Sequence, residues 1–146
     1  MPFKNQLQYE PKRQNRFLVN FPKNFGIDPW YVRSVTRPRY TFSIKGKGKW
    51  DVMEITFVDP IKPSTSESLF KLTTMVEELK KSQKVGLPLF TFDISTLDPT
   101  GVVVENWTID VRSIVYIDFG MSNYENDDVQ TPKMVIRPAR CTLDLS

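Results

Sequence analysis

The chain has 146 residues, of which 40% are hydrophobic and 25% are charged, and its formal net charge is +3. This length fits a single domain with a sizeable core. The sequence has no histidine and one cysteine, which excludes an internal disulfide, Ser-His-Asp and Cys-His catalytic systems, and every His-ligated metal site. It also lacks the ~20-residue apolar run of a membrane helix and the apolar stretch of a secretory signal.

The first part of the chain predicts an arm followed by short strands. Residues 1–15 are polar and contain two prolines, so we expect an N-terminal arm ahead of a single domain over residues 16–146. A short β-branched and aromatic run, residues 16–21, ends at a proline, and residues 30–36 form a second run of this kind.

The next segment predicts two strands around a turn. Tyr40, Phe42 and Ile44 alternate with polar residues, a period of two that is typical of core side chains on a strand. The glycine- and lysine-rich stretch 45–49 predicts a turn or a mobile loop. Residues 50–58 predict one strong strand.

A single helix is predicted after this strand. Ser64 and Glu67 have the spacing of a capping box, in which each side chain satisfies a backbone N–H at the start of a helix. The helix is expected to end near Ser82. Four apolar residues then form one stripe along it, which we expect to face the core: Leu69, Leu72, Val76 and Leu79.

The last third predicts three β-segments. Residues 89–95 alternate as a strand does, and a tight turn over 98–101 leads to a β-rich run, 102–119, that is long enough to bend near Arg112. A polar loop over 120–132 precedes a closing strand. In that strand Pro138 predicts a bulge or an edge, and Cys141 is expected to be a small buried residue.

These segments predict a mainly β fold: a β-sandwich or small barrel of about six to eight strands with one helix on its flank. Such a domain has edge strands, which pair with other chains unless they are blocked.

Charge is segregated along the chain. Residues 29–50 contain no acid, and residues 113–132 contain no lysine or arginine. One region is therefore purely basic and the other purely acidic. The basic region includes Arg37, Arg39, Lys45, Lys47 and Lys49, and the acidic region includes Glu125, Asp127 and Asp128.

No pattern predicts a catalytic site, a metal site or a cofactor. The sequence Gly46-Lys47-Gly48-Lys49 lacks the spacing of a phosphate-binding loop, the acidic loop lacks the order of a calcium loop, and no two carboxylates have a distinctive spacing. Basic residues interleaved with aromatic residues over 37–50 leave one binding alternative, a monomeric β-barrel that binds nucleic acid.

The order of these motifs resembles the bacteriophage tail tube protein family, which is related to the inner-tube proteins of contractile injection systems. The resemblance covers roughly residues 16–143. It rests on four groups of residues. The first two are Ser34-Val35-Thr36-Arg37-Pro38, and the strand over 50–58 with Asp59-Pro60 and the following helix. The other two are Leu97-Asp98-Pro99-Thr100-Gly101 with Glu105-Asn106-Trp107, and Ile117-Asp118-Phe119-Gly120 with Tyr124-Glu125-Asn126-Asp127-Asp128.

The resemblance implies a structural virion protein and no enzyme. Its subunits would join edge strands into hexameric rings, and the rings would stack into the tail tube that conducts DNA into the host. On this resemblance, the basic candidates of one ring are expected to contact the acidic candidates of a neighbouring subunit. The alternative interpretation is that both regions are solvated loops. Implied partners are other copies of the chain, a tail sheath in contractile tails, baseplate and terminator proteins, and genomic DNA passing through the lumen without sequence-specific binding. No small-molecule substrate or membrane insertion is implied. The expected location is the virion, assembled in the host cytoplasm. A tube-like baseplate or tube-initiator protein of the same fold is the alternative within this family.

Overall fold

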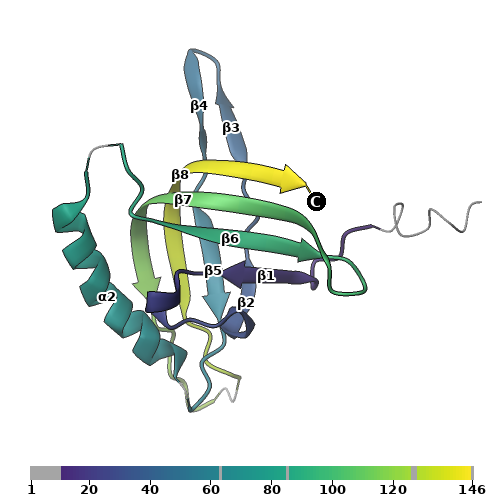
Figure 1. Cartoon of the computed structure of the whole chain (residues 1–146). Helices are drawn as coiled ribbons and strands as arrows, with labels where there is room; N and C mark the ends of the chain where they lie inside the picture. The colour runs from purple at the N-terminus through teal and green to yellow at the C-terminus, as the bar shows by residue number, and fades with distance from the viewer. Residues whose placement is uncertain (1–10, 63, 85, 126–127, 146) are drawn as a thin grey trace, which may run out of the picture.

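The computed structural model describes residues 11–62, 64–84, 86–125 and 128–145. Six strands form one antiparallel sheet in the order β1-β6-β7-β8-β5-β2, and the sheet curls until β1 and β2, at its two ends, approach each other. Two further strands form a separate hairpin that extends away from this sheet (Figure 1). The main sheet is therefore a nearly closed barrel, which confirms the predicted mainly β fold with a single flanking helix in the described ranges.

The strands are short in the first half of the chain and long in the last third. Two single-turn 3-10 helices, η2 (Lys23–Phe25) and η3 (Pro29–Tyr31), connect the first two strands. The strands are β1 (Phe17–Asn20), β2 (Val32–Val35), β3 (Tyr40–Ser43), β4 (Gly46–Trp50), β5 (Met53–Phe57), β6 (Phe90–Leu97), β7 (Val103–Asp118) and β8 (Lys133–Leu145).

Alternate side chains of the strands fill the barrel. Ile55, Ile109 and Ile136, from three different strands, are all 0% exposed. An aromatic cluster adjoins them, in which the ring centroid of Phe21 lies 5.2 Å from that of Phe92. The predicted strand pattern of residues 89–95 is confirmed, with Phe90, Phe92 and Ile94 buried, and so is the predicted burial of Cys141.

The helix α2 (Thr65–Ser82) lies on the flank of the barrel (Figure 1). Its predicted cap is confirmed at Ser64, whose Oγ accepts a hydrogen bond from the Glu67 backbone N–H at 3.2 Å. The sequence did not reveal that Asp59 strengthens this start by accepting a hydrogen bond from the Ser66 backbone N–H at 3.1 Å. Along the predicted stripe, Leu69, Leu72 and Val76 are buried and Leu79 is half-buried against the core.

Three predictions for residues 40–58 are wrong. The stretch 45–49 is not a loop, because strand β4 begins at Gly46 and only Ile44 and Lys45 form the turn. Phe42 is 86% exposed and Ile44 is 102% exposed, so their alternation does not mark a core face. The predicted strand over 50–58 is also divided, since β4 ends at Trp50 and β5 starts at Met53.

The long predicted strand near the C-terminus is one continuous, strongly curved element. β7 changes its register against β8 at three places between Asp110 and Tyr116, which fits the bend expected near Arg112. One shift occurs where Val111 pairs with Pro138, so the predicted irregularity at this proline is confirmed.

The turn before β7 is held by one side chain. The Oδ1 atom of Asp98 accepts hydrogen bonds from the backbone N–H groups of Thr100 at 2.8 Å and Val102 at 2.9 Å. Gly101 has φ of +88°, a conformation that glycine adopts without strain.

The expected arm, residues 1–15, lies mostly outside the described residues. Of its described part, Lys12 contacts the barrel through an ion pair with Glu105. Within the described ranges, no helix has the length and apolar character needed to cross a membrane.

Candidate assembly surfaces

The β3–β4 hairpin, residues 40–50, is the first candidate surface. Its strands pair from Tyr40 with Trp50 to Ser43 with Gly46, which leaves Ile44 and Lys45 at the tip. The exposed apolar side chains of this hairpin stand beside three exposed lysines, Lys45, Lys47 and Lys49. The hairpin therefore presents apolar surface and positive charge together.

An ion pair fixes the base of the hairpin. The Nε atom of Arg39 lies 2.6 Å from Oδ2 of Asp51, and the same oxygen accepts a hydrogen bond from Thr41 at 2.8 Å. The hydrogen bonds from Arg39 and then Thr41 hold the pKa of Asp51 below its ordinary value.

Aromatic contacts join the hairpin to the barrel. The ring of Trp50 meets the ring of Tyr40 at 5.0 Å and that of Trp107, on β7, at 6.1 Å, both in edge-to-face geometry. Such pairs stabilise each other beyond the area they bury. The hairpin is therefore anchored at its base, while its tip stands in solvent (Figure 1).

A buried carboxylate lies close to this base. The side chain of Glu105 is 2% exposed; it forms ion pairs with Lys12 and Arg37 and accepts a hydrogen bond from Trp107 Nε1 at 3.0 Å. Burial opposes its ionisation, but the hydrogen bond from Lys12 and the charges of Arg37 and Lys12 outweigh this effect, so the pKa of Glu105 is lowered. These contacts link Lys12, in the segment before β1, and Arg37, in the segment before β3, to Glu105 on β7.

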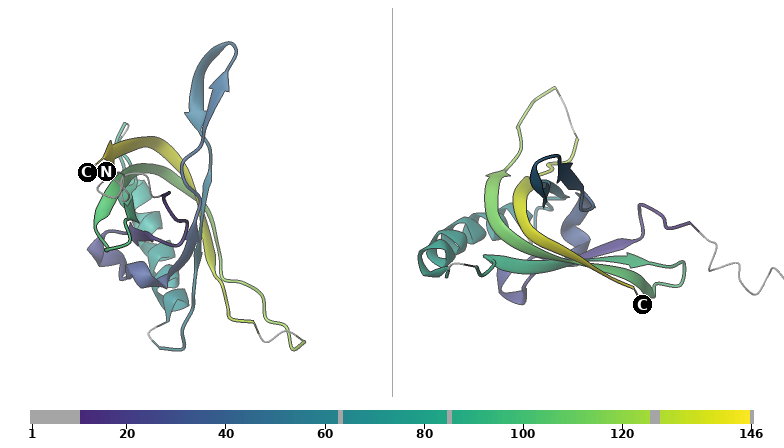
Figure 2. Two further views of the ribbon diagram at one scale, coloured as in Figure 1. Left: turned by 90° about the vertical axis from the view of Figure 1, so that its right-hand side faces the viewer. Right: turned by 90° about the horizontal axis from the view of Figure 1, so that it is seen from above.

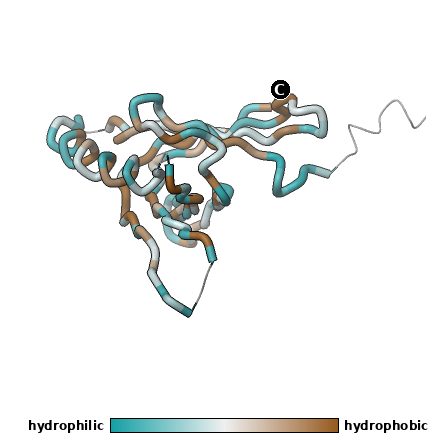
Figure 3. The backbone as a smooth tube through the Cα atoms, turned by 90° about the horizontal axis from the view of Figure 1, so that it is seen from below, coloured by the Kyte–Doolittle hydropathy of each residue, from teal (hydrophilic) through white to brown (hydrophobic). Residues whose placement is uncertain are grey.

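The β7–β8 loop, residues 119–132, is the second candidate surface. Its described part exposes apolar side chains, with Met121 at 81%, Tyr124 at 110% and Val129 at 63% exposure. In Figure 3 the loop extends away from the body of the molecule, with hydrophobic colouring mainly near its base and hydrophilic colouring toward the far end of its described part. Glu125 and Asp128 add negative charge.

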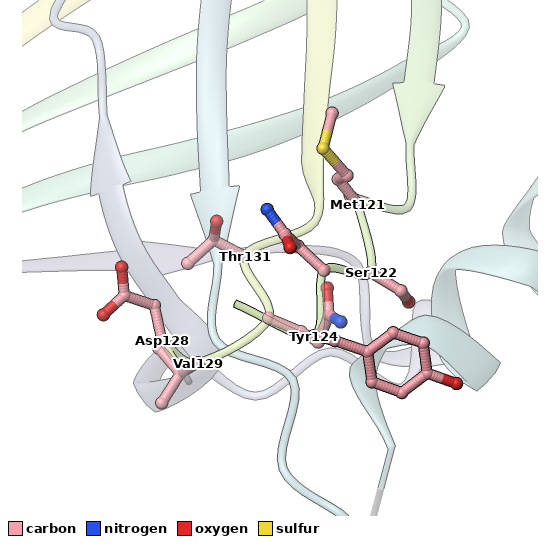
Figure 4. Close-up of a pocket in the computed structure, with 9 residues that line it drawn as sticks. Met121, Ser122, Tyr124, Asp128, Val129 and Thr131 are labelled. Atoms are coloured by element: carbon pink, nitrogen blue, oxygen red, sulfur yellow. The ribbon is translucent and has the colours of Figure 1, made fainter. Parts of the chain in front are cut away.

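The loop encloses a recess of about 580 Å³. Met121, Tyr124, Asp128, Val129 and Thr131 are among the residues that line it. Figure 4 shows Asp128 and Val129 on one side of this recess and Tyr124 on the other. Its lining thus combines a few apolar side chains with a majority of polar ones, among them the carboxylate of Asp128.

The hairpin and the loop lie at opposite ends of the molecule, as Figures 1 and 2 show from different sides. The candidate residues are therefore not brought together within one chain. Three basic candidates lie on the hairpin, whereas Arg37 and Arg39 form ion pairs at its base. Of the acidic candidates, Glu125 and Asp128 lie on the loop, and Asp127 is outside the described residues.

Sequence reasoning missed a basic groove between the hairpin and β8. The groove has a volume of about 340 Å³, and the rings of Tyr40 and Trp50 form part of its wall. Its cations come from three strands: Lys47, Lys49, Arg112, Arg137 and Arg140. The sequence gives no signal for this grouping, because it depends on the curvature that brings β8 to the hairpin.

Long strand edges remain open among the described residues. β6 pairs with β7 only as far as Val111, so residues 112–118 have a sheet partner on one side. Likewise, β5 pairs with β8 only over residues 133–136, which leaves residues 137–145 paired with β7 alone. Such edges provide backbone N–H and C=O groups for a strand of another chain.

No family model matches the sequence, and no curated protein matches it significantly in sequence. The fold, in contrast, matches solved structures over nearly the whole chain. A chain of the PVC sheath–tube complex, from an extracellular contractile injection system in the extended state, aligns with a TM-score of 0.62 and 11% identity, covering 98% of this chain and 97% of that one.

Two further matches come from the ends of such particles. A chain of the anti-feeding prophage baseplate aligns with a TM-score of 0.57 and 14% identity, covering 92% of this chain and 96% of that chain. A chain of the PVC sheath/tube terminator aligns with a TM-score of 0.58 and 10% identity, covering 92% and 97%. The chain has the fold of contractile injection system tube and terminator proteins, which confirms the predicted resemblance at the level of fold.

Proposed function

We propose that this chain, which has the fold of contractile injection system tube and terminator proteins, is a structural subunit that polymerises into the tube of a phage tail or a related particle. One observation carries the proposal. The two opposite ends of the molecule both expose apolar side chains, and they bear opposite charges. Large exposed apolar patches usually mark an interface. When one end of a molecule is complementary to the opposite end of another copy, the copies bind head to tail. Such a contact can repeat indefinitely and build a filament instead of a closed dimer.

Within a ring, we propose that copies join through the open edges of β7 and β8. Pairing the edge at 112–118 of one copy with the edge at 137–145 of the next would give a sheet partner to backbone groups that have none on that side in a single chain. Repeated around a closed ring, expected to contain six copies, this pairing makes one continuous barrel around a lumen.

Between rings, we propose that the lysines of the hairpin meet the acidic loop of another copy. Lys45, Lys47 and Lys49 would face Glu125, Asp127 and Asp128, while Arg37 and Arg39 hold the hairpin base in place. Charge pairs of this kind give register and specificity more than affinity.

The proposed partners follow from this role. They are further copies of the chain, a surrounding sheath, baseplate and terminator proteins, and DNA or another cargo that passes through the lumen without sequence-specific binding. We propose a location in the assembled tail or particle. The baseplate match supports a second candidate, a tube-like protein that starts the tube at the baseplate. The basic groove beside Trp50 supports the third, nucleic-acid binding.

Negative-stain electron microscopy of the purified protein across a concentration series, without DNA, tests the proposal. Rings or hollow filaments are the expected result. If the protein stays monomeric at every concentration but forms filaments when a baseplate complex is added, an initiator-dependent tube subunit is the better description. A monomer that binds DNA with strong salt dependence would favour the nucleic-acid alternative and contradict the main proposal.

Charge reversal tests the contact between rings. The triple variant Lys45→Glu/Lys47→Glu/Lys49→Glu should leave the fold intact and abolish filaments, because like charges would then meet at the interface. A matched control, Lys23→Glu/Lys71→Glu/Lys84→Glu, makes the same change in net charge at exposed lysines elsewhere. Filaments formed equally well by both variants would contradict the proposed contact.

A further inference from the structure

We propose that the tip of the β3–β4 hairpin inserts into the recess of the β7–β8 loop of a second copy, with Ile44 as the buried apolar side chain and Lys45 beside the loop carboxylates. This inference rests on the proposed end-to-end assembly. It goes further by naming the residue that inserts and the cavity that receives it.

The tip residues are poorly explained by the hairpin alone. Ile44 occupies a two-residue turn, a position that Gly, Asn, Asp and Ser usually fill because their conformations suit tight turns. No non-glycine residue of the described chain has a positive φ, so Ile44 adopts the turn without a left-handed backbone. A β-branched apolar side chain that is 102% exposed at this point gains its stabilisation only when another surface covers it.

The recess offers apolar side chains among its polar ones. Its walls include Met121, Tyr124 and Val129, which are themselves largely exposed in a single copy. A methionine wall adapts to an inserted side chain because its three rotatable bonds let it fill irregular gaps. Insertion of Ile44 would remove apolar surface from water on both partners at once.

Charge complements the apolar contact. Lys45 directly follows Ile44 at the tip, and Asp128 lines the recess. Glu125 lies on the same loop, and residues 113–132 contain no lysine or arginine. An ammonium group entering this loop therefore meets a negative field, which would orient the tip as it inserts.

The fold places the tip and the recess at opposite ends, so one copy cannot fill its own recess (Figure 2). The contact must be made between copies, and each copy can take part in two such contacts. The tip-to-recess contact therefore differs from a simple symmetric dimer, in which both copies would use the same surface.

Cysteine cross-linking tests the inference directly. The variant Ile44→Cys/Val129→Cys is assembled and then oxidised under mild conditions, and it should give a ladder of covalent oligomers on a non-reducing gel. Native Cys141 should not interfere, because it is buried and burial raises the pKa of its thiol to about 12. The control Ile44→Cys/Leu87→Cys places the second thiol at a residue that is 58% exposed beyond the end of α2, and it should stay monomeric on the gel.

A second measurement does not depend on introduced cysteines. Ile44→Ser should raise the concentration needed for assembly at least tenfold, roughly the effect of leaving one apolar side chain in water. Ile44→Val, which keeps most of the apolar surface, should raise it far less. Filaments that assemble normally in Ile44→Ser and show no cross-link would overturn this inference and leave the proposed tube role standing. Failure of the unaltered chain to assemble, even after a baseplate complex is added, would overturn both.

Discussion

Arg37 compensates a buried charge. Glu105 is 2% exposed, and its carboxylate contacts the cations of Lys12 and Arg37. Removing one partner of a buried ion pair is costly because the remaining charge stays desolvated. We expect Arg37→Met to lower the free energy of unfolding by about 1–3 kcal/mol, less than the loss of a sole partner, because Lys12 and Trp107 still contact the carboxylate.

Urea unfolding of the unassembled protein measures this effect. Arg33→Met is the matched control, because Arg33 is exposed on the neighbouring strand β2 and its replacement should change the stability by no more than about 0.5 kcal/mol. Adding Glu105→Gln to Arg37→Met should recover part of the loss, since no buried charge then remains. Equal effects of the Arg37 and Arg33 substitutions would contradict this account.

Cys141 should be chemically inert in the folded chain. Burial, with a smaller effect from the charge of Asp110, raises the pKa of its thiol to about 12. Alkylation by iodoacetamide at pH 8 should be at least about 100-fold slower than in urea, since the thiolate is the reactive form. The variant Ser122→Cys supplies an exposed thiol as a positive control. Labelling of the wild type as fast as that of Ser122→Cys would show that Cys141 is accessible.

At the scale of elements, one glycine shapes the hairpin. A Cβ atom on residue 48 would lie 2.4 Å from the backbone oxygen of Thr41 and 2.7 Å from the ring of Tyr40. Gly48→Ala should therefore force the strands apart and loosen the hairpin, whereas the separate barrel should keep its stability.

Amide hydrogen exchange can localise this change. In Gly48→Ala we expect exchange of the amides of residues 40–50 to accelerate roughly tenfold, with the amides of β7 and β8 unaffected. Lys47→Ala is the control on the same strand, because Lys47 is exposed and already carries a Cβ. Unchanged exchange in Gly48→Ala would mean that the strands accommodate the methyl group without separating.

The sequence predicts elements best where local pattern and burial agree. The helix has a cap and an apolar stripe, and the strand β6 has an inward face of Phe90, Phe92 and Ile94, so both were found. Alternation of Tyr40, Phe42 and Ile44 follows the same rule, but these residues belong to a hairpin that projects into solvent. Period-two patterning identifies a shared face and does not say what covers it.

The candidate surfaces were predictable only in part. The segregation of charge can be recognised in the sequence alone, whereas the contact inferred from it stays a prediction. The cluster at Glu105 could not be found in this way, since Arg37 and Glu105 are 68 positions apart and meet only because the sheet curls into a nearly closed barrel.

At the scale of the whole molecule, acid should destabilise the fold. The pKa values of Asp51, Asp59, Asp98 and Glu105 are all lowered in the folded chain. As the pH falls, the unfolded chain takes up protons at these groups before the folded chain does. The stability they provide is therefore complete about one pH unit above the ordinary pKa values of Asp and Glu, near pH 5.5, and is lost progressively as the pH falls.

Thermal unfolding between pH 7 and pH 2.5 should show this loss as a falling midpoint. In Glu105→Gln one of the four groups no longer titrates, so the midpoint should depend less steeply on pH in the acid range. If the variant and the wild type have parallel curves below pH 4.5, the folded pKa of Glu105 is not lowered.

The separation of hairpin and loop gives any assembly built through them a direction. A column of copies joined tip to recess always ends in unfilled hairpins on one side and empty recesses on the other. The two ends are then chemically different, one basic and one acidic. A protein that carries only the loop surface would stop growth at the hairpin end and leave the other end free, so the length of the column can be controlled separately at each end.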